Sequence, residues 1–185
     1  MPRMPSLWDP LTALAPVAPV RGMRAAVLVP IYEEAGALRL IMTRRPDDMR
    51  RHPGDVVFPG GMIEPGDDGP TAAAIRETTE EIGLPAENVR EILGALEPVN
   101  ARAATLRIVP IVARVDRPVT LVPHPGEVAA IIEPRITDLL RDEDWRTSNW
   151  GGHTMWFYEF DEGVLWGATS RMVRNLLGLF RRSEG

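Results

Sequence analysis

The chain has 185 residues, of which 44% are hydrophobic and 25% charged, a composition typical of one globular domain with room for a sizeable core. It contains no cysteine, which excludes a disulfide framework, a zinc–thiolate site and a cysteine nucleophile, and which fits a cytoplasmic protein. A net charge of −5 argues against nucleic acid as the main ligand, and no apolar run reaches the roughly 18 residues of a membrane span.

The basic residues are of one kind. All 21 are arginine, which excludes lysine Schiff-base chemistry and a P-loop lysine. Arginine can grip phosphate groups bidentately. Coding bias also removes lysine from a chain, however, so this composition does not by itself indicate a phosphate ligand.

The N-terminal residues 1–22 are rich in proline and lack any periodicity. We therefore predict an arm that lies over the domain, with Leu7, Trp8 and Leu11 as its anchors and with disorder in the first few residues. This segment is taken as separate from the single domain predicted for residues 23–185.

A hairpin is predicted next. The apolar run 25–31 is typical of a buried strand, residues 33–36 make a turn, and residues 38–43 return as a second strand. The following residues, 44–57, form a polar loop rich in arginine. Within that loop we interpret His52 as structural in preference to a phosphate or ribose contact.

A helix is predicted after a glycine-rich stretch. Pro70 suits its first turn, and Gly83 suits the left-handed position just beyond its last turn. One face is expected to be apolar and the other acidic. The apolar residues are Ala72, Ile75, Thr79 and Ile82, and the acidic ones are Glu77, Glu80 and Glu81.

Three carboxylates at this spacing repel one another, and a divalent cation removes the repulsion. Hard oxygen ligands suit Mg²⁺ or Mn²⁺, and Mg²⁺ typically takes one or two protein carboxylates together with substrate phosphates. A run of charges usually only faces water. Only the longer motif that surrounds these glutamates, described below, favours a metal site for a phosphate substrate over a solvated face.

The rest of the chain alternates between strands and loops. Two strands are predicted within residues 89–116, where Pro110 would need a sheet edge or a bulge. Glu127 stands just before a further strand-like run, and a short helix follows within 134–144. Residues 145–152 are interpreted as a polar loop.

A strand at 155–160 and a helix at about 168–180 close the chain. The helix has an amphipathic core face. That face comprises Met172, Val173, Leu176, Leu177 and Phe180.

The helix and its glycine-rich loop, residues 58–84, resemble the Nudix box, G-x5-E-x7-R-E-U-x-E-E-x-G-U, in which U is aliphatic. The matching positions are held by Arg76, Glu77, Glu80, Glu81, Gly83 and Leu84. Thr78 stands where an aliphatic residue is usual. The early acidic position falls on Asp68 or, if one extra residue is allowed before Arg76, on Asp67 with Gly61 in register.

The residues before the box resemble a signature of the coenzyme A pyrophosphatase branch, L-L-T-x-R-(S/A)-x3-R-x3-G-x3-F-P-G-G. It runs from Ile41 to Gly61, with Pro46 in place of the small residue and with Asp55 where many members carry glutamine. Near the other end of the chain, residues 165–169 resemble the Trp-Gly-x-Thr element that opens the final helix in this branch.

This resemblance implies an α/β/α sandwich with a mixed central sheet, within the broader α/β (α+β) class. It also implies hydrolysis of the pyrophosphate bond of coenzyme A or its acyl or oxidised derivatives, with Mg²⁺ or Mn²⁺. The products would be adenosine 3′,5′-bisphosphate and 4′-phosphopantetheine. Two alternatives stay open: a Nudix enzyme for ADP-ribose, NADH or dinucleoside polyphosphates, and a non-catalytic module that senses nucleotides.

The resemblance also suggests roles for individual residues. Glu77, Glu80 and Glu81 would bind the metal, and Arg76 would orient Glu77 or its neighbours. The catalytic base would be Glu80 or Glu127, since Nudix enzymes often bring one further carboxylate from a distant loop.

Substrate phosphates would meet the arginines of the basic loop and the Gly60-Gly61 turn, where backbone can approach closely. The arginines are Arg44, Arg45, Arg50 and Arg51. Family analogy alone suggests a homodimer, and no membrane or nucleic-acid partner is expected.

Overall fold

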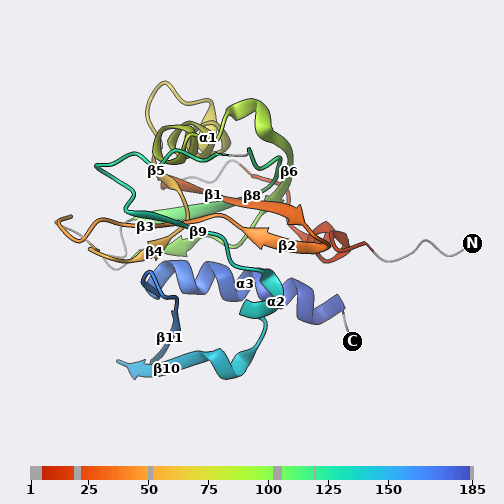
Figure 1. The fold of residues 1–185 in the computed structure, drawn as a ribbon, viewed down its shortest axis with the longest axis vertical. Coiled ribbons are helices and arrows are strands. Elements are labelled where there is room, and N and C mark those ends of the chain that lie inside the picture. Colours follow the sequence, from red (N-terminus) through yellow and green to blue (C-terminus); the bar gives the residue numbers. More distant parts are fainter. Residues whose placement is uncertain (1–5, 19–21, 50–51, 102–105, 119, 184–185) are drawn as a thin grey trace, which may run out of the picture.

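A computed structural model describes residues 6–18, 22–49, 52–101, 106–118 and 120–183. A mixed sheet lies between two helices, α1 (Gly69–Ile82) on one face and α3 (Gly167–Ser183) on the other, as Figure 1 shows. This is the predicted α/β/α sandwich. Both helices lie where the sequence predicts a helix.

The central sheet is built around two long parallel strands, β1 and β8. Its strand order is β2 (Ala37–Leu40), β1 (Met23–Glu34), β8 (Arg107–Val115) and β6 (Val89–Ala95). The short strands β5 (Gly60–Met62) and β7 (Val99–Asn100) extend it, paired antiparallel with β1 and β8 respectively.

Two three-stranded sheets flank this core. One consists of β4 (Val56–Val57), β3 (Met42–Arg44) and β9 (Ala130–Ile132). The other consists of β10 (Trp145–Trp150), β11 (His153–Glu159) and β12 (Val164–Leu165), and lies beyond α3 in Figure 1. The short helix α2 (Ile136–Leu139) and the 3-10 turns η1 (Asp9–Ala13), η2 (Ala86–Asn88) and η3 (Asp142–Asp144) complete the elements. None of the described helices is long and apolar enough to cross a membrane.

Strand β1 divides the core into two halves because its side chains alternate between the faces of the sheet. Ala26 and Leu28 belong to the cluster under α1, whereas Val29 and Ile31 belong to the cluster under α3. The predicted apolar face of α3 is confirmed. Met172, Val173, Leu176, Leu177 and Phe180 are all buried.

Residues 145–152, interpreted as a polar loop, instead form β10 and a tight turn. Only Trp145 of this strand is buried, so no alternation marks it. The pairing with β11 is set by the turn at Gly151 and Gly152, which both have positive φ angles of 57° and 81°. This segment is a strand because it pairs with β11, and the local sequence pattern does not predict that pairing.

Pro110 also lies in a different place from the one expected. It sits in β8, between β1 and the β6–β7 side of the sheet. Its carbonyl accepts from the Leu96 N–H at 3.0 Å, just where the neighbour changes from β6 to β7. The missing N–H of proline faces the same side as its carbonyl, so the break between these two strands accommodates it.

The N-terminal arm contacts the domain through several residues. Leu11 is 2% exposed, and the Ala95 N–H donates to the Ala15 carbonyl at 2.8 Å. Trp8 donates to Glu33 at 3.0 Å and lies under the Arg114 guanidinium. Leu7 is 44% exposed, so the expectation that it anchors the arm is wrong. The boundary at residue 22 stays a prediction.

We expect the arm to contribute to stability through Leu11. A Leu11→Ala substitution should lower the free energy of unfolding by about 2–5 kcal/mol, because it removes a fully buried side chain. The matched control Leu7→Ala should change it by less than about 0.5 kcal/mol. Urea denaturation of both variants measures this, and equal effects would contradict the anchoring role of Leu11.

Candidate active site on helix α1

The buried face of α1 differs from the predicted one. It consists of Ala73, Ala74, Thr78 and Ile82, whereas Thr79 is exposed. Glu77 and Glu81 flank this face and are partly buried, so acidic and apolar residues do not lie on opposite sides as expected. The reason is that α1 packs against β5 as well as against the central strands.

Thr78, which stands at the usually aliphatic position, is 1% exposed. Its hydroxyl donates to the Ala74 carbonyl one turn earlier, at 2.6 Å. A buried hydroxyl is costly only when it lacks a partner. Threonine can therefore replace the aliphatic residue here without leaving an unsatisfied polar group.

Gly61 allows Glu77 to approach the sheet. A Cβ atom at position 61 would lie 2.5 Å from the Glu77 carboxyl carbon, well inside a normal contact. Gly60 has φ of 151° and faces the Ala26 carbonyl and Val27 just as closely. The two glycines belong to strand β5 rather than to a turn, and the contacts that demand them are to protein.

Glu81 lies deeper than Glu77. Its Oε2 accepts from the Gly60 N–H at 3.3 Å. Burial raises the pKa of Glu81 to about 8, and the nearby charges of Glu77 and Glu127 act in the same direction, whereas the Gly60 N–H and Arg45 oppose the rise. Burial likewise raises the pKa of Glu77, against the opposing effect of Arg76.

Arg76 holds the acidic side chains of this region together. Its guanidinium contacts both oxygens of Asp67 at 3.0 Å and Glu77 Oε1 at 3.0 Å. It also reaches Glu80 at 3.4 Å and donates to the Met62 carbonyl at 3.1 Å. Arg76 therefore fixes Glu77 by a charge-assisted bond, in the geometry expected for an orienting residue.

Asp67, not Asp68, is the partner of Arg76. Its side chain is 7% exposed, and its hydrogen bonds with Arg76 lower its pKa. Asp68 precedes the helix without a side-chain capping bond. The motif alone left both residues open, and the alignment with one extra residue before Arg76, which also puts Gly61 in register, is the one that matches the structure.

Glu127 comes from far along the chain to the same region. Its segment is held to the end of α1, where the His124 N–H donates to the Glu81 carbonyl at 2.7 Å. Two residues after Glu127, the Ala129 N–H donates to the Arg44 carbonyl at 2.8 Å. Glu127 is exposed, and its charge raises the pKa of both Glu77 and Glu81.

The basic loop starts beside these carboxylates. Arg45 lowers the pKa of Glu81, and Arg44 lies in β3 with an ion pair to Asp47. The Nε atoms of both arginines are buried and make no hydrogen bond within the described residues. Arg50 and Arg51 lie outside the described residues, so their predicted contacts stay predictions.

The side chain of Asp55 links this loop to the start of α3. Its Oδ1 accepts from Trp166 Nε1 at 2.7 Å, and its Oδ2 lies 3.0 Å from His52 Nδ1. The upstream signature and the Trp-Gly element therefore meet in space. Sequence analysis noted both Asp55 and Trp166 but gave no reason to pair them, because 111 positions separate them.

The donor set fits a hard divalent cation. Glu77 and Glu81 present partly buried carboxylates whose mutual repulsion a cation would relieve. Among the described residues, no three acidic or histidine side chains are gathered to hold a metal on their own. Two carboxylates suffice for Mg²⁺ when waters and substrate phosphates complete the shell. Glu80 is 58% exposed and turns toward Arg76, so its predicted place among the ligands stays a prediction.

Comparison with known proteins shows the family to which the chain belongs. A model of the NUDIX domain matches residues 22–150. An uncharacterized Nudix hydrolase, NudL, of Photorhabdus laumondii is 35% identical over 156 residues, which cover 82% of each chain. Nudix hydrolase 22, a chloroplastic protein of Arabidopsis thaliana, is 35% identical over 87% of this chain and 56% of its own. The chain therefore belongs to the Nudix hydrolase family.

Solved structures show the same fold at low identity. The MutT protein of Methanosarcina mazei has a TM-score of 0.56 at 18% identity, covering 92% of this chain and 96% of its own. A C. elegans Ap4A hydrolase has a TM-score of 0.53 at 23% identity, covering 64% and 84%. At these identities the similarity concerns the fold alone.

The pKa of Glu81 predicts how stability depends on pH. The folded chain keeps this carboxyl protonated to about pH 8, whereas the unfolded chain releases the proton near the ordinary value of 4.5. The free energy of unfolding should therefore fall by a few kcal/mol as pH rises between these values in the presence of a chelator. Glu81→Gln should remove most of this fall in urea denaturation, and parallel curves for both proteins would contradict the pKa assignment.

Asp67 should support cation binding through Arg76. We expect Asp67→Asn to weaken Mn²⁺ binding about 10- to 100-fold, because Arg76 would lose the carboxylate that fixes it beside Glu77. Asp68→Asn, which changes the neighbouring residue without a side-chain bond, should leave the affinity unchanged. Titration calorimetry measures both, and an equal loss in the two variants would contradict the role of Asp67.

Proposed function

We propose that this chain hydrolyses the pyrophosphate bond of coenzyme A or of its acyl or oxidised derivatives. The observation that carries the proposal is the meeting of two motifs: the arginine loop of the coenzyme A pyrophosphatase signature starts beside the carboxylates of the Nudix helix. The Nudix helix is common to the family, whereas the loop signature points to the substrate.

The geometry suggests a role for each residue of the proposed site. When bound at Glu77 and Glu81, Mg²⁺ or Mn²⁺ would neutralise phosphate charge and lower the pKa of a water. Arg76 keeps Glu77 in place, and the Gly60 N–H keeps Glu81 in place. Arg44 and Arg45 stand at the edge of this region and would hold the diphosphate.

The bond changes are those of a hydrolysis. A water oxygen forms a new bond to one phosphorus while the bridging P–O bond breaks and the leaving phosphate takes the electron pair. The proton of the water passes to a carboxylate, for which Glu80 and Glu127 both remain candidates. Both are exposed and lie beside the proposed ligands, Glu80 through Arg76 and Glu127 through the loop that follows α1.

A second candidate is a Nudix enzyme for other nucleoside diphosphate compounds. One structural neighbour is a C. elegans Ap4A hydrolase, and another is the NUDIX domain of Shewanella oneidensis NrtR in complex with ADP-ribose. A third candidate, a non-catalytic nucleotide sensor, is disfavoured by the intact Glu77, Glu80 and Glu81. A cytoplasmic location and a homodimer also remain proposals, from the absence of cysteine and from family analogy.

The decisive experiment offers the protein a panel of substrates with Mg²⁺: coenzyme A, acetyl-coenzyme A, ADP-ribose, NADH and diadenosine tetraphosphate. We expect coenzyme A compounds to yield adenosine 3′,5′-bisphosphate, measured by chromatography. Glu81→Gln should lose nearly all turnover because it removes a proposed ligand.

Two other outcomes have clear meanings. Cleavage of ADP-ribose or NADH alone would keep the function of the helix and refute the substrate assignment. Nucleotide binding without turnover of any compound would identify a sensor and refute the enzymatic proposal.

A further inference from the structure

The outer face of the β10–β11–β12 sheet forms an open groove with a volume of about 550 Å³. Strand pairing places Arg146 opposite Phe157, Ser148 opposite Met155, and Glu159 opposite Val164, so these side chains share one face. The opposite face carries Trp145, Tyr158 and Leu165, which are buried against the core under α3. The groove is therefore not part of the core.

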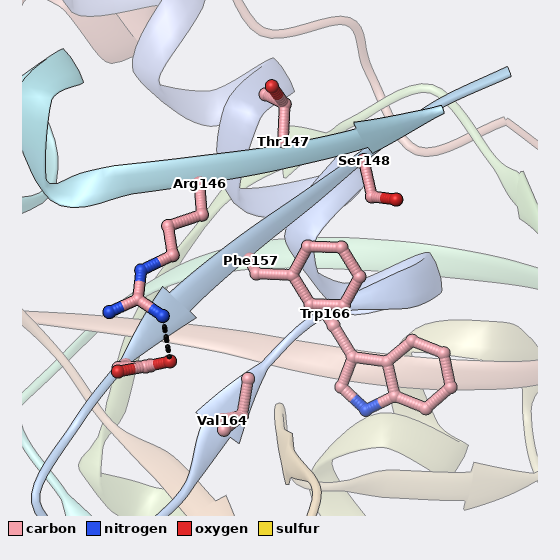
Figure 2. Close-up of a pocket in the computed structure, with 7 residues that line it drawn as sticks. Arg146, Thr147, Ser148, Phe157, Val164 and Trp166 are labelled. Atoms are coloured by element: carbon pink, nitrogen blue, oxygen red, sulfur yellow. Dashed lines mark ion pairs between the residues drawn. The ribbon is translucent and has the colours of Figure 1, made fainter. Parts of the chain in front are cut away.

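Aromatic rings form the floor of this groove. Phe157 and Trp166 are nearly parallel, with an interplanar angle of 6° and ring centroids 6.3 Å apart. Figure 2 shows the Ser148 hydroxyl on the side of these rings, whereas Thr147 points away from them. An outer sheet face is usually polar, so partly exposed Phe157 and Val164 at this position call for an explanation.

The groove is joined to the proposed phosphate site. Trp166 donates its indole N–H to Asp55, and Asp55 lies in the loop whose first residues are Arg44 and Arg45. Asp55 and Val164 also form a β-bridge. The Arg45 N–H donates to the Asp55 carbonyl at 3.0 Å, so a ligand held by its diphosphate at Glu81 and Arg45 would meet this groove beside Asp55.

The charge of the groove selects one half of such a ligand. Among the described residues, the charged side chains that line it are Arg146 and Glu159, which form an ion pair at 3.0 Å and so offset one another. The adenosine half of coenzyme A carries a 3′-phosphate, which needs a cation. The pantetheine half is an uncharged chain of amide and methylene groups, which suits aromatic rings and a hydroxyl.

We propose that this groove is the subsite for the pantetheine arm and the acyl chain of the substrate. The inference rests on the proposed function and deepens it, because it assigns the part of the protein that recognises the non-nucleotide half. Phe157 and Trp166 provide the apolar floor, Ser148 provides a hydrogen-bonding group, and Asp55 couples the position of Trp166 to the phosphate loop.

The test compares filling the groove with an equally large change beside it. Ser148→Trp places an indole over the aromatic floor from an exposed strand position, and Asn149→Trp, at the next exposed position of the same strand, places one on the opposite face of the sheet. We measure kcat/KM for octanoyl-coenzyme A. We also measure the inhibition constant of adenosine 3′-phosphate 5′-diphosphate, which is the nucleotide half without the arm.

The expected result is a fall of about tenfold or more in kcat/KM for octanoyl-coenzyme A in Ser148→Trp, the size of discrimination that an apolar pocket provides. The inhibition constant should stay unchanged, and Asn149→Trp should resemble the parent protein. Phe157→Ser, which removes the ring instead of blocking it, should cause the same selective loss. Thermal unfolding checks that the variants are folded, and Phe157→Ser serves if Ser148→Trp is not.

Three results would overturn the inference. An unchanged kcat/KM in both groove variants would show that the arm lies elsewhere. A higher inhibition constant in Ser148→Trp, meaning weaker binding of the nucleotide half, would assign the groove to that half. If the parent protein cleaves no coenzyme A compound, the proposed function fails together with the inference. This outcome is distinct from the first two, in which the parent protein cleaves octanoyl-coenzyme A.

Discussion

The structure of the site depends on the close contact between the carboxylate of Glu77 and the backbone of Gly61. A Cβ atom at position 61 would lie 2.5 Å from that carboxyl group, so any other residue there would force the Glu77 carboxylate to move. The contact allows α1 to pack with its acidic side partly covered by β5. Glu77 and Glu81 are consequently partly buried at the place where helix and strand meet.

This burial has an energetic cost that the surrounding groups only partly offset. The pKa of Glu81 is raised to about 8, which shows that its ionised form is disfavoured in the absence of a cation. Arg76 counteracts the same effect at Glu77 and is itself held by Asp67. Positive charge would therefore stabilise the ionised forms of these carboxylates, and a divalent metal would supply that charge.

The loop of residues 44–57 extends this region away from α1. Its start lies near Glu81 through Arg45, and its end is attached to Trp166 through Asp55. The two ends lie side by side, because the Arg45 N–H donates to the Asp55 carbonyl at 3.0 Å, and together they connect the carboxylates of α1 to the outer β10–β12 sheet. This connection suits a substrate with a charged diphosphate and an uncharged arm.

The sequence by itself determined much of this protein. The motif spacing predicted the helix from Pro70 to Gly83 and the family, and an apolar run predicted the long strand β1, because these depend on residues near one another in the chain. Tertiary structure decided which side of α1 is buried, that Asp67 is the partner of Arg76, and that residues 145–150 form a strand. Only the tertiary structure places Asp55 beside Trp166. Each of these features arises from contacts between segments distant in sequence, and local pattern carries no information about which distant backbone will cover a given side chain.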